Sequence, residues 1–137
     1  MNNYVGPGLA AVMMLVVGCS SLGDTRSASK ALEARSAEHW GLLMSGQWQQ
    51  ALSMTTPAYQ ERTSVGTYAG NYGGAWTWAR VDFKSAACDD DERASRCVVR
   101  SEIIYLIRNP QADDYMGARL VDRTWVKLQG DWYLYEG

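Results

Sequence analysis

The sequence has few prolines and no excess of charge of one sign. It holds three prolines in 137 residues, and its 47% hydrophobic and 20% charged content is typical of a folded chain rather than a disordered one. A chain of this length is expected to form one domain with its own core. The formal net charge of -2 provides no basic field that would gather phosphates, so we expect no nucleic-acid partner.

The common catalytic and metal-binding motifs are also missing. The sequence has no glycine-rich phosphate loop, no arrangement typical of a Ser/His/Asp triad and no zinc-ligand spacing. The acidic run from Asp89 to Glu92 lacks the spacing with which an EF-hand loop surrounds calcium, and we interpret it as a solvated hairpin tip. We therefore predict neither a metal ion nor a cofactor.

The N-terminal segment lacks charge but is strongly apolar. The first eighteen residues carry no charged side chain, and the run from Leu9 to Val17 is apolar throughout. A transmembrane helix needs about 20 apolar residues, so this shorter run fits the hydrophobic part of a signal peptide. The alternative is a buried apolar strand or helix that ends in a cysteine.

Residues 16 to 19, Val-Val-Gly-Cys, resemble the bacterial lipobox. The resemblance implies that residues 1–18 are a lipoprotein signal peptide and that Cys19 is acylated, which would anchor the protein to a membrane. It also implies that Ser20, standing where aspartate favours retention in the inner membrane, directs the protein to the outer membrane. The domain would then lie in the periplasm.

Acylation of Cys19 leaves Cys88 and Cys97 as an even pair. The polar segment between them suits a hairpin loop, and facing residues of antiparallel strands can meet the Cα separation that a disulfide requires. We predict a disulfide between them, in keeping with an oxidising compartment; two reduced, buried cysteines are the alternative. The C-x-x-C spacing of redox and metal-binding pairs is absent.

The hydrophobic pattern changes its period halfway along the chain. Leu32, Trp40 and Leu43 recur at helical spacing, whereas Val81 and Phe83 alternate with charged residues as in a strand. We expect helices over 29–45, 47–54, 57–62 and 64–68, and strands over 76–88, 97–108, 118–129 and 132–136. This order predicts a lipidated, polar tether over 19–28 and a single α+β domain over 29–137. Its helices would pack on one face of a curved antiparallel sheet of about four strands.

Several residues resemble the nuclear transport factor 2-like superfamily. They are Gly46, Trp48, Ala51, Leu52, Thr56, Pro57 and Tyr59, followed by long strands and a terminal hairpin at Gly130-Asp131-Trp132-Tyr133. The resemblance covers residues 29–137 and implies a cone-shaped fold in which the sheet wraps a long helix and leaves a pocket. Members include enzymes, ligand binders and assembly modules, so the resemblance does not decide the activity.

His39 is the single histidine, and the resemblance implies an Asp/His pair inside the cone in those members that are enzymes. Strict alternation places Asp122 on the same strand face as Leu120, Thr124 and Val126, which makes it a carboxylate on an apolar face. His39 and Asp122 are therefore the candidate catalytic pair, one as general base and the other orienting it. The alternative is that a β-bulge turns Asp122 outwards and that His39 is solvated or structural.

The strand face opposite this predicted core carries a set of tryptophan and arginine residues. The members of the candidate interface are Trp78, Arg80, Arg100, Arg123 and Trp125. Tryptophan and arginine are enriched at protein interfaces, although long arginine and lysine stems can also simply cover the indoles.

We therefore expect a non-catalytic binding or assembly module of the cell envelope, which contacts another envelope protein or a second copy of itself through this face. A small isomerase or hydrolase that uses His39 and Asp122, and a carrier of apolar small molecules, are the alternatives.

Overall fold

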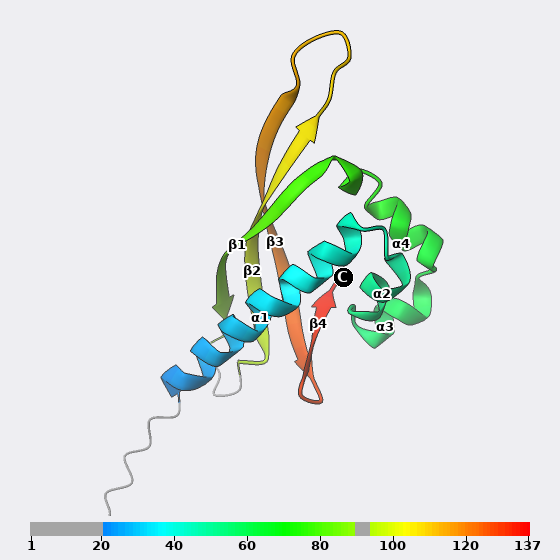
Figure 1. The fold of residues 1–137 in the computed structure, drawn as a ribbon. Coiled ribbons are helices and arrows are strands. Elements are labelled where there is room, and N and C mark those ends of the chain that lie inside the picture. The colour runs from blue at the N-terminus through cyan, green and yellow to red at the C-terminus, as the bar shows by residue number, and fades with distance from the viewer. Residues whose placement is uncertain (1–20, 90–93) are drawn as a thin grey trace, which may run out of the picture.

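The computed structural model describes residues 21–89 and 94–137 (Figure 1). The helices are α1 (Ser21–Met44), α2 (Trp48–Ser53), α3 (Pro57–Arg62) and α4 (Val65–Asn71), followed by a 3-10 turn, η1 (Ala75–Thr77). The strands are β1 (Trp78–Cys88), β2 (Arg96–Ile107), β3 (Tyr115–Leu128) and β4 (Asp131–Tyr135). The predicted lipidation site Cys19 and most of the acidic run after Asp89 lie outside the described residues.

The four strands form one antiparallel sheet in the order β1-β2-β3-β4, so each strand pairs with the next along the chain. The helices gather on one side of this sheet, with α1 running across it and α2, α3 and α4 beside the C-terminal strand (Figure 1). The α+β prediction is confirmed. No helix in the described part of the chain is long and apolar enough to cross a membrane.

Helix α1 begins at Ser21, eight residues before the predicted start, so the segment expected to be a tether is helical over residues 21–28. Ala28 is 9% exposed and packs in the same core cluster as Leu32, which explains why this turn is ordered against the domain. The helix ends where Gly46 adopts a φ of +71°, and the Gln47 N–H bonds the Leu42 carbonyl as in a Schellman motif. Leu32, Trp40 and Leu43 are all buried, so their spacing predicted the buried face of α1 correctly.

The short helices begin at the predicted signals. Pro57 occupies the first turn of α3, where its missing N–H is harmless. The Ser64 hydroxyl accepts a hydrogen bond of 3.1 Å from the Thr67 N–H and so caps α4. Helix α4 continues to Asn71, three residues beyond the predicted end, and this extension brings Tyr72 near the sheet.

The β1–β2 and β3–β4 hairpins are each closed by a local feature, a disulfide in the first and a tight turn in the second. Cys88 and Cys97 face each other at the end of the β1–β2 pair and form the predicted disulfide. At the same end of the sheet, Gln129 and Gly130 have φ angles of +52° and +90° and make a two-residue turn between β3 and β4. This turn lies one residue earlier than the expected Gly130-Asp131 turn.

The face of β3 that contacts the helices is the opposite of the one that the alternation predicted. Its pairing sets Trp125 beside Cys97 and Arg123 beside Val99, and both of these β2 residues are 1% exposed in the core. Side chains of paired residues share a sheet face, so Val121, Arg123 and Trp125 point towards the helices. Leu120, Asp122, Thr124, Val126 and Leu128 lie on the opposite, open face. The prediction failed because both faces of β3 carry large apolar residues, and only the pairing with β2 decides between them.

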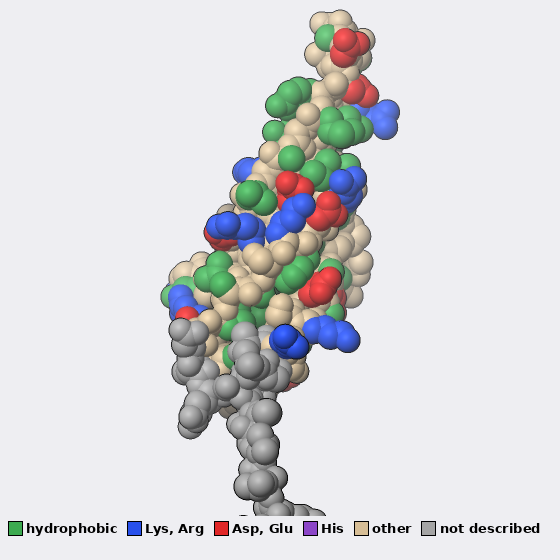
Figure 2. Space-filling model, turned by 90° about the vertical axis from the view of Figure 1, so that its left-hand side faces the viewer, with side chains coloured by type: hydrophobic (Ala, Val, Ile, Leu, Met, Phe, Trp, Pro, Cys, Tyr) green, Lys and Arg blue, Asp and Glu red, His purple; other side chains and the backbone are tan. Residues whose placement is uncertain are grey.

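The hairpin formed by β2 and β3 projects well beyond the helices (Figure 1). Strand β1 stops pairing with β2 at Tyr105, and β4 pairs only with the stretch from Thr124 to Leu128. The part of the hairpin from Tyr105 to Arg119 is called the arm below. Figure 2 shows hydrophobic side chains along one side of the arm, above a zone where acidic and basic side chains alternate.

Candidate functional site

His39 lies on α1 and is completely buried between the helices and the sheet. Its Nε2 is 2.7 Å from the hydroxyl oxygen of Tyr68 on α4, and its Nδ1 is 3.2 Å from Nη1 of Arg123 on β3. A guanidinium group only donates hydrogen bonds, so Nδ1 has to be the acceptor. The ring proton is then on Nε2 and is donated to Tyr68.

The surroundings keep this imidazole neutral. Burial lowers the pKa of His39 to about 3, with further contributions from the positive charges of Arg123 and Arg35. Burial likewise raises the pKa of Tyr68 and of Tyr72, so both phenols stay protonated. His39 therefore holds Tyr68 and Arg123 in place as a neutral bridge.

Arg123 connects this network to an aromatic wall and to the C-terminal strand. Its guanidinium carbon lies 4.0 Å from the centre of the Trp40 ring, a cation-π contact. Its Nη2 donates a 2.8 Å hydrogen bond to the Tyr72 hydroxyl, which in turn donates to a carboxylate oxygen of Glu136. The direct polar partners of Arg123 are thus a neutral histidine and a neutral phenol.

The predicted catalytic pair does not assemble. Asp122 lies on the open face of the sheet, where both of its oxygens accept hydrogen bonds of 2.7 Å from Arg100. The Asp122 side chain is 45% exposed, whereas His39 is buried behind the other face. The hydrogen bond from Arg100 lowers the pKa of this carboxyl group. The predicted partner of His39 was wrong by one position along β3. The next residue, Arg123, is the one that contacts His39.

The predicted tryptophan and arginine interface is also divided between the two faces. Trp125 is 1% exposed in the core, and Trp78 packs edge-on against Trp40 with ring centres 5.4 Å apart. Together with Arg123 these residues belong to the helix side. On the open face, Arg80 forms an ion pair with Asp82 at 2.9 Å, and Arg100 pairs with Asp122 as described. The described residues therefore form no continuous tryptophan and arginine surface on that face.

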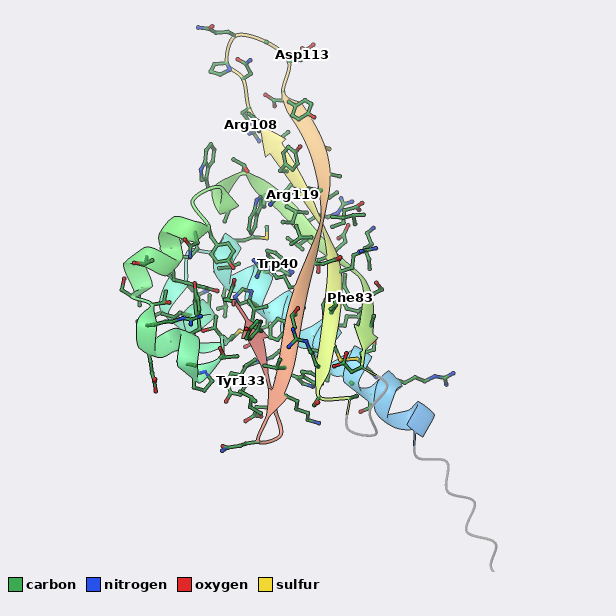
Figure 3. The ribbon with its side chains drawn as sticks, turned by 180° about the vertical axis from the view of Figure 1, so that it is seen from behind. Trp40, Phe83, Arg108, Asp113, Arg119 and Tyr133 are labelled. Atoms are coloured by element: carbon green, nitrogen blue, oxygen red, sulfur yellow. A yellow bond between two sulfur atoms is a disulfide. The ribbon has the colours of Figure 1, made fainter. Side chains whose placement is uncertain are left out.

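A pocket of about 380 Å³ opens beside the buried network. Strand β3 contributes Arg119, Val121 and Arg123, and the segment from α4 to β1 contributes the opposite side. The aromatic lining residues are Trp40, Tyr72, Trp78 and Tyr105. Figure 3 shows Arg119 on the sheet side above Trp40. This volume lies within the range of small-molecule sites.

The Tyr105 ring is placed by a glycine on the neighbouring strand. Tyr105 pairs with Gly117, and a Cβ atom at Gly117 would overlap the ring. The absent side chain lets the ring lie flat across β3, in the manner of an aromatic residue that covers a glycine in a sheet. Gly117 stands just before the strand predicted over 118–129, whereas β3 begins at Tyr115 and includes it. A lone glycine within a strand indicates a close approach.

Two arginines line the pocket, and no carboxylate of the described residues pairs directly with either of them. Among the residues that the structure describes, neither Arg119 nor Arg123 forms an ion pair with a carboxylate. Glu136 reaches Arg123 only through the Tyr72 hydroxyl. The described residues also contain no cluster of three or more histidine, cysteine or acidic side chains that could hold a metal ion. The arrangement is suited to binding an anion rather than a cation.

The fold and the site define an α+β domain that encloses an aromatic, arginine-containing pocket between its helices and an antiparallel meander. No protein-family model matches the chain, and no curated protein matches it. Among solved structures, it is similar to the solution structure of a SEC-C motif containing protein from Rhodopseudomonas palustris, with a TM-score of 0.55 and 15% sequence identity. The similarity covers 77% of this chain and 75% of that one. At this identity it shows the fold alone.

Proposed function

We propose that this chain is a non-catalytic binding module of the cell envelope, anchored through Cys19 to the outer membrane with its domain in the periplasm. We further propose that its pocket binds a small organic anion with a flat apolar body. One observation supports the ligand class above all others: Arg119 and Arg123 border an aromatic pocket, and no described carboxylate pairs with either guanidinium group.

The charge of the ligand follows from the chemistry of arginine. A guanidinium group has five N–H donors in a fixed plane and binds a carboxylate or phosphate through two parallel hydrogen bonds. The contacts to His39 and Tyr72 engage only Nη1 and Nη2 of Arg123, so donors remain. Arg119 is exposed at the mouth of the pocket, where its whole donor set is accessible. A carboxylate at the mouth of the pocket would find these donors on Arg119.

The flat, apolar body of the proposed ligand is inferred from the aromatic side chains that line the pocket. Trp78 and Tyr105 are partly exposed and offer ring surfaces that bury flat apolar groups well, whereas Trp40 is 4% exposed and already covered by Arg123. An uncharged apolar ligand, as the carrier alternative requires, would partly desolvate two guanidinium groups without giving either an anionic partner, which is unfavourable. The enzyme alternative loses its support because His39 and Asp122 lie on opposite sides of the sheet.

The test compares an aromatic acid with its uncharged amide. Full-length protein purified from membranes is titrated by calorimetry with indole-3-acetate and with indole-3-acetamide. We expect the acid to bind and the amide to bind at least about tenfold more weakly, because a charge-assisted hydrogen bond contributes about 1.5–3 kcal/mol.

Arg119→Gln should reduce the affinity for the acid by a similar factor. Arg100→Gln, a matched change on the open face of the sheet, should leave it unchanged. Equal affinity of the two compounds, or equal affinity of the acid for the wild type and Arg119→Gln, would contradict the proposed ligand class.

A further inference from the structure

Among the residues that the structure describes, no strand pairs with one edge of β3 over part of its length. Residues 115–123 pair with β2 on one side, but β4 reaches only from Thr124 to Leu128 on the other. In Figures 1 and 3 this stretch forms the outer border of the arm, on the side away from the helices. Unpaired backbone N–H and C=O groups on such an edge are a template for another strand.

The turn at the end of β3 shows which backbone groups face outwards. In a hairpin with a two-residue turn, the flanking residues, here Leu128 and Asp131, exchange hydrogen bonds. Backbone orientation alternates along a strand, so every second residue back from Leu128 directs its N–H and C=O to that same side. On the unpaired stretch these residues are Met116, Ala118, Leu120 and Asp122.

Two of the features by which proteins usually block edge pairing, proline and a β-bulge, are missing from this edge. Over residues 115–120 there is no proline, and the pairing of β3 with β2 continues without a bulge from Arg96 to Ile107. The side chains of Tyr115, Met116 and Leu120 are 59%, 66% and 56% exposed. Apolar side chains therefore flank the open hydrogen-bonding groups.

We propose that two copies of this chain pair antiparallel through this edge, with a twofold axis at Ala118. In this register Met116 lies opposite the partner's Leu120, and Leu120 opposite the partner's Met116, so the exposed apolar side chains cover one another. Facing pairs of this kind exchange two backbone hydrogen bonds each. The two sheets then continue into one another.

The pattern of side chains selects this register over its neighbours. An axis at Arg119 would place two guanidinium groups directly opposite each other and Met116 opposite a carboxylate, both unfavourable. An axis at Gly117 would place Leu120 opposite the partner's Asp114. With the axis at Ala118, like charges meet only at the ends, where Asp122 is already paired with Arg100 within its own chain. The edge is thus complementary to itself, which favours a second copy over an unrelated strand.

The experiment measures the mass of the full-length, detergent-solubilised protein by sedimentation equilibrium. Wild type is expected to be a dimer and Ala118→Pro a monomer, because proline removes an N–H that faces the partner without removing a bond to β2. Leu120→Lys should also give a monomer. Leu128→Lys is the matched control, since Leu128 is 41% exposed on the same strand but its edge is covered by β4; it should remain a dimer.

A second measurement fixes the register. Ala118→Cys should form a disulfide-linked dimer under oxidising conditions, because the residue faces its own copy. Met116→Cys alone should not, whereas Met116→Cys combined with Leu120→Cys should. A monomeric wild type, a dimer that survives Ala118→Pro, or cross-linking by Met116→Cys alone would overturn the proposal. None of these outcomes depends on the pocket ligand.

Discussion

His39 is neutral in the folded domain because it is buried and its Nδ1 lone pair accepts a hydrogen bond from the Arg123 guanidinium group. Its pKa is lowered from 6.5 to about 3. The unfolded chain therefore takes up a proton at this ring at a higher pH than the folded chain does. The contribution of His39 to stability is complete above about pH 6.5 and is lost progressively as the pH falls towards 3.

We predict that lowering the pH from 7 to 4.5 costs the wild type up to about 3 kcal/mol through His39, since one pKa unit corresponds to about 1.4 kcal/mol. Urea unfolding at the two pH values measures this difference. His39→Gln should be less stable at pH 7, because hydrogen bonds to Tyr68 and Arg123 are disturbed. Its further loss on acidification should be smaller than that of the wild type by the same amount. Identical losses in both proteins would show that His39 is already exposed to protons in the fold.

At the scale of secondary-structure elements, the β1–β2 hairpin is held at its end by the Cys88–Cys97 disulfide. Cys97 is also 1% exposed in the core beside Trp125, so the bond fixes a buried position and not merely a loop. On the chain-entropy model, a loop this short contributes about 2.5–3 kcal/mol.

We predict that reduction of this disulfide lowers the free energy of unfolding by about that amount while the sheet survives. Urea unfolding with and without a reductant, followed by circular dichroism, measures the change. Cys88→Ser combined with Cys97→Ser should reproduce the reduced protein and show no response to reductant. If reduction leaves the unfolding midpoint of the wild type unchanged, the hairpin does not depend on the bond.

The helices could be predicted more accurately than the faces of the strands. Thr56-Pro57 and the spacing of Leu32, Trp40 and Leu43 are local signals, and the structure confirms the bounds of α3 and the buried side of α1. The face of β3 depends instead on its register with β2, a nonlocal property that sets Trp125 beside Cys97. A shift of one residue exchanges the two faces of a strand. The same error produced both the His39 and Asp122 pair and the divided interface.

At the scale of the whole molecule, the site was not predictable because its residues come from distant parts of the chain. His39 and Trp40 lie on α1, Tyr68 and Tyr72 in or just after α4, and Arg123 on β3. The sequence did single out His39 and Arg123, but it assigned them to different sites. The resemblance to the nuclear transport factor 2-like superfamily stays a prediction.

The envelope location is also a property of the whole molecule, and intact-mass analysis of membrane fractions tests it. We expect loss of residues 1–18, acyl chains on the new N-terminal Cys19 and the mass of one disulfide. Cys19→Ser should abolish the lipid and release the protein from the membrane fraction. An unmodified Cys19 together with two free thiols in the wild type would contradict both the anchor and the compartment.

The start of α1 and the tip of the arm lie at opposite ends of the molecule (Figure 1). In the antiparallel pair proposed above, the two arms overlap at the centre and the two starts of α1 lie at the far ends. The proposed lipid anchors on Cys19 precede these helix starts in the sequence. Both can enter one lipid bilayer only if the pair lies flat along the bilayer surface, with the twofold axis perpendicular to the membrane. If the pair instead stands on end, its anchors enter two facing bilayers, and the length of the paired arms sets the gap between them.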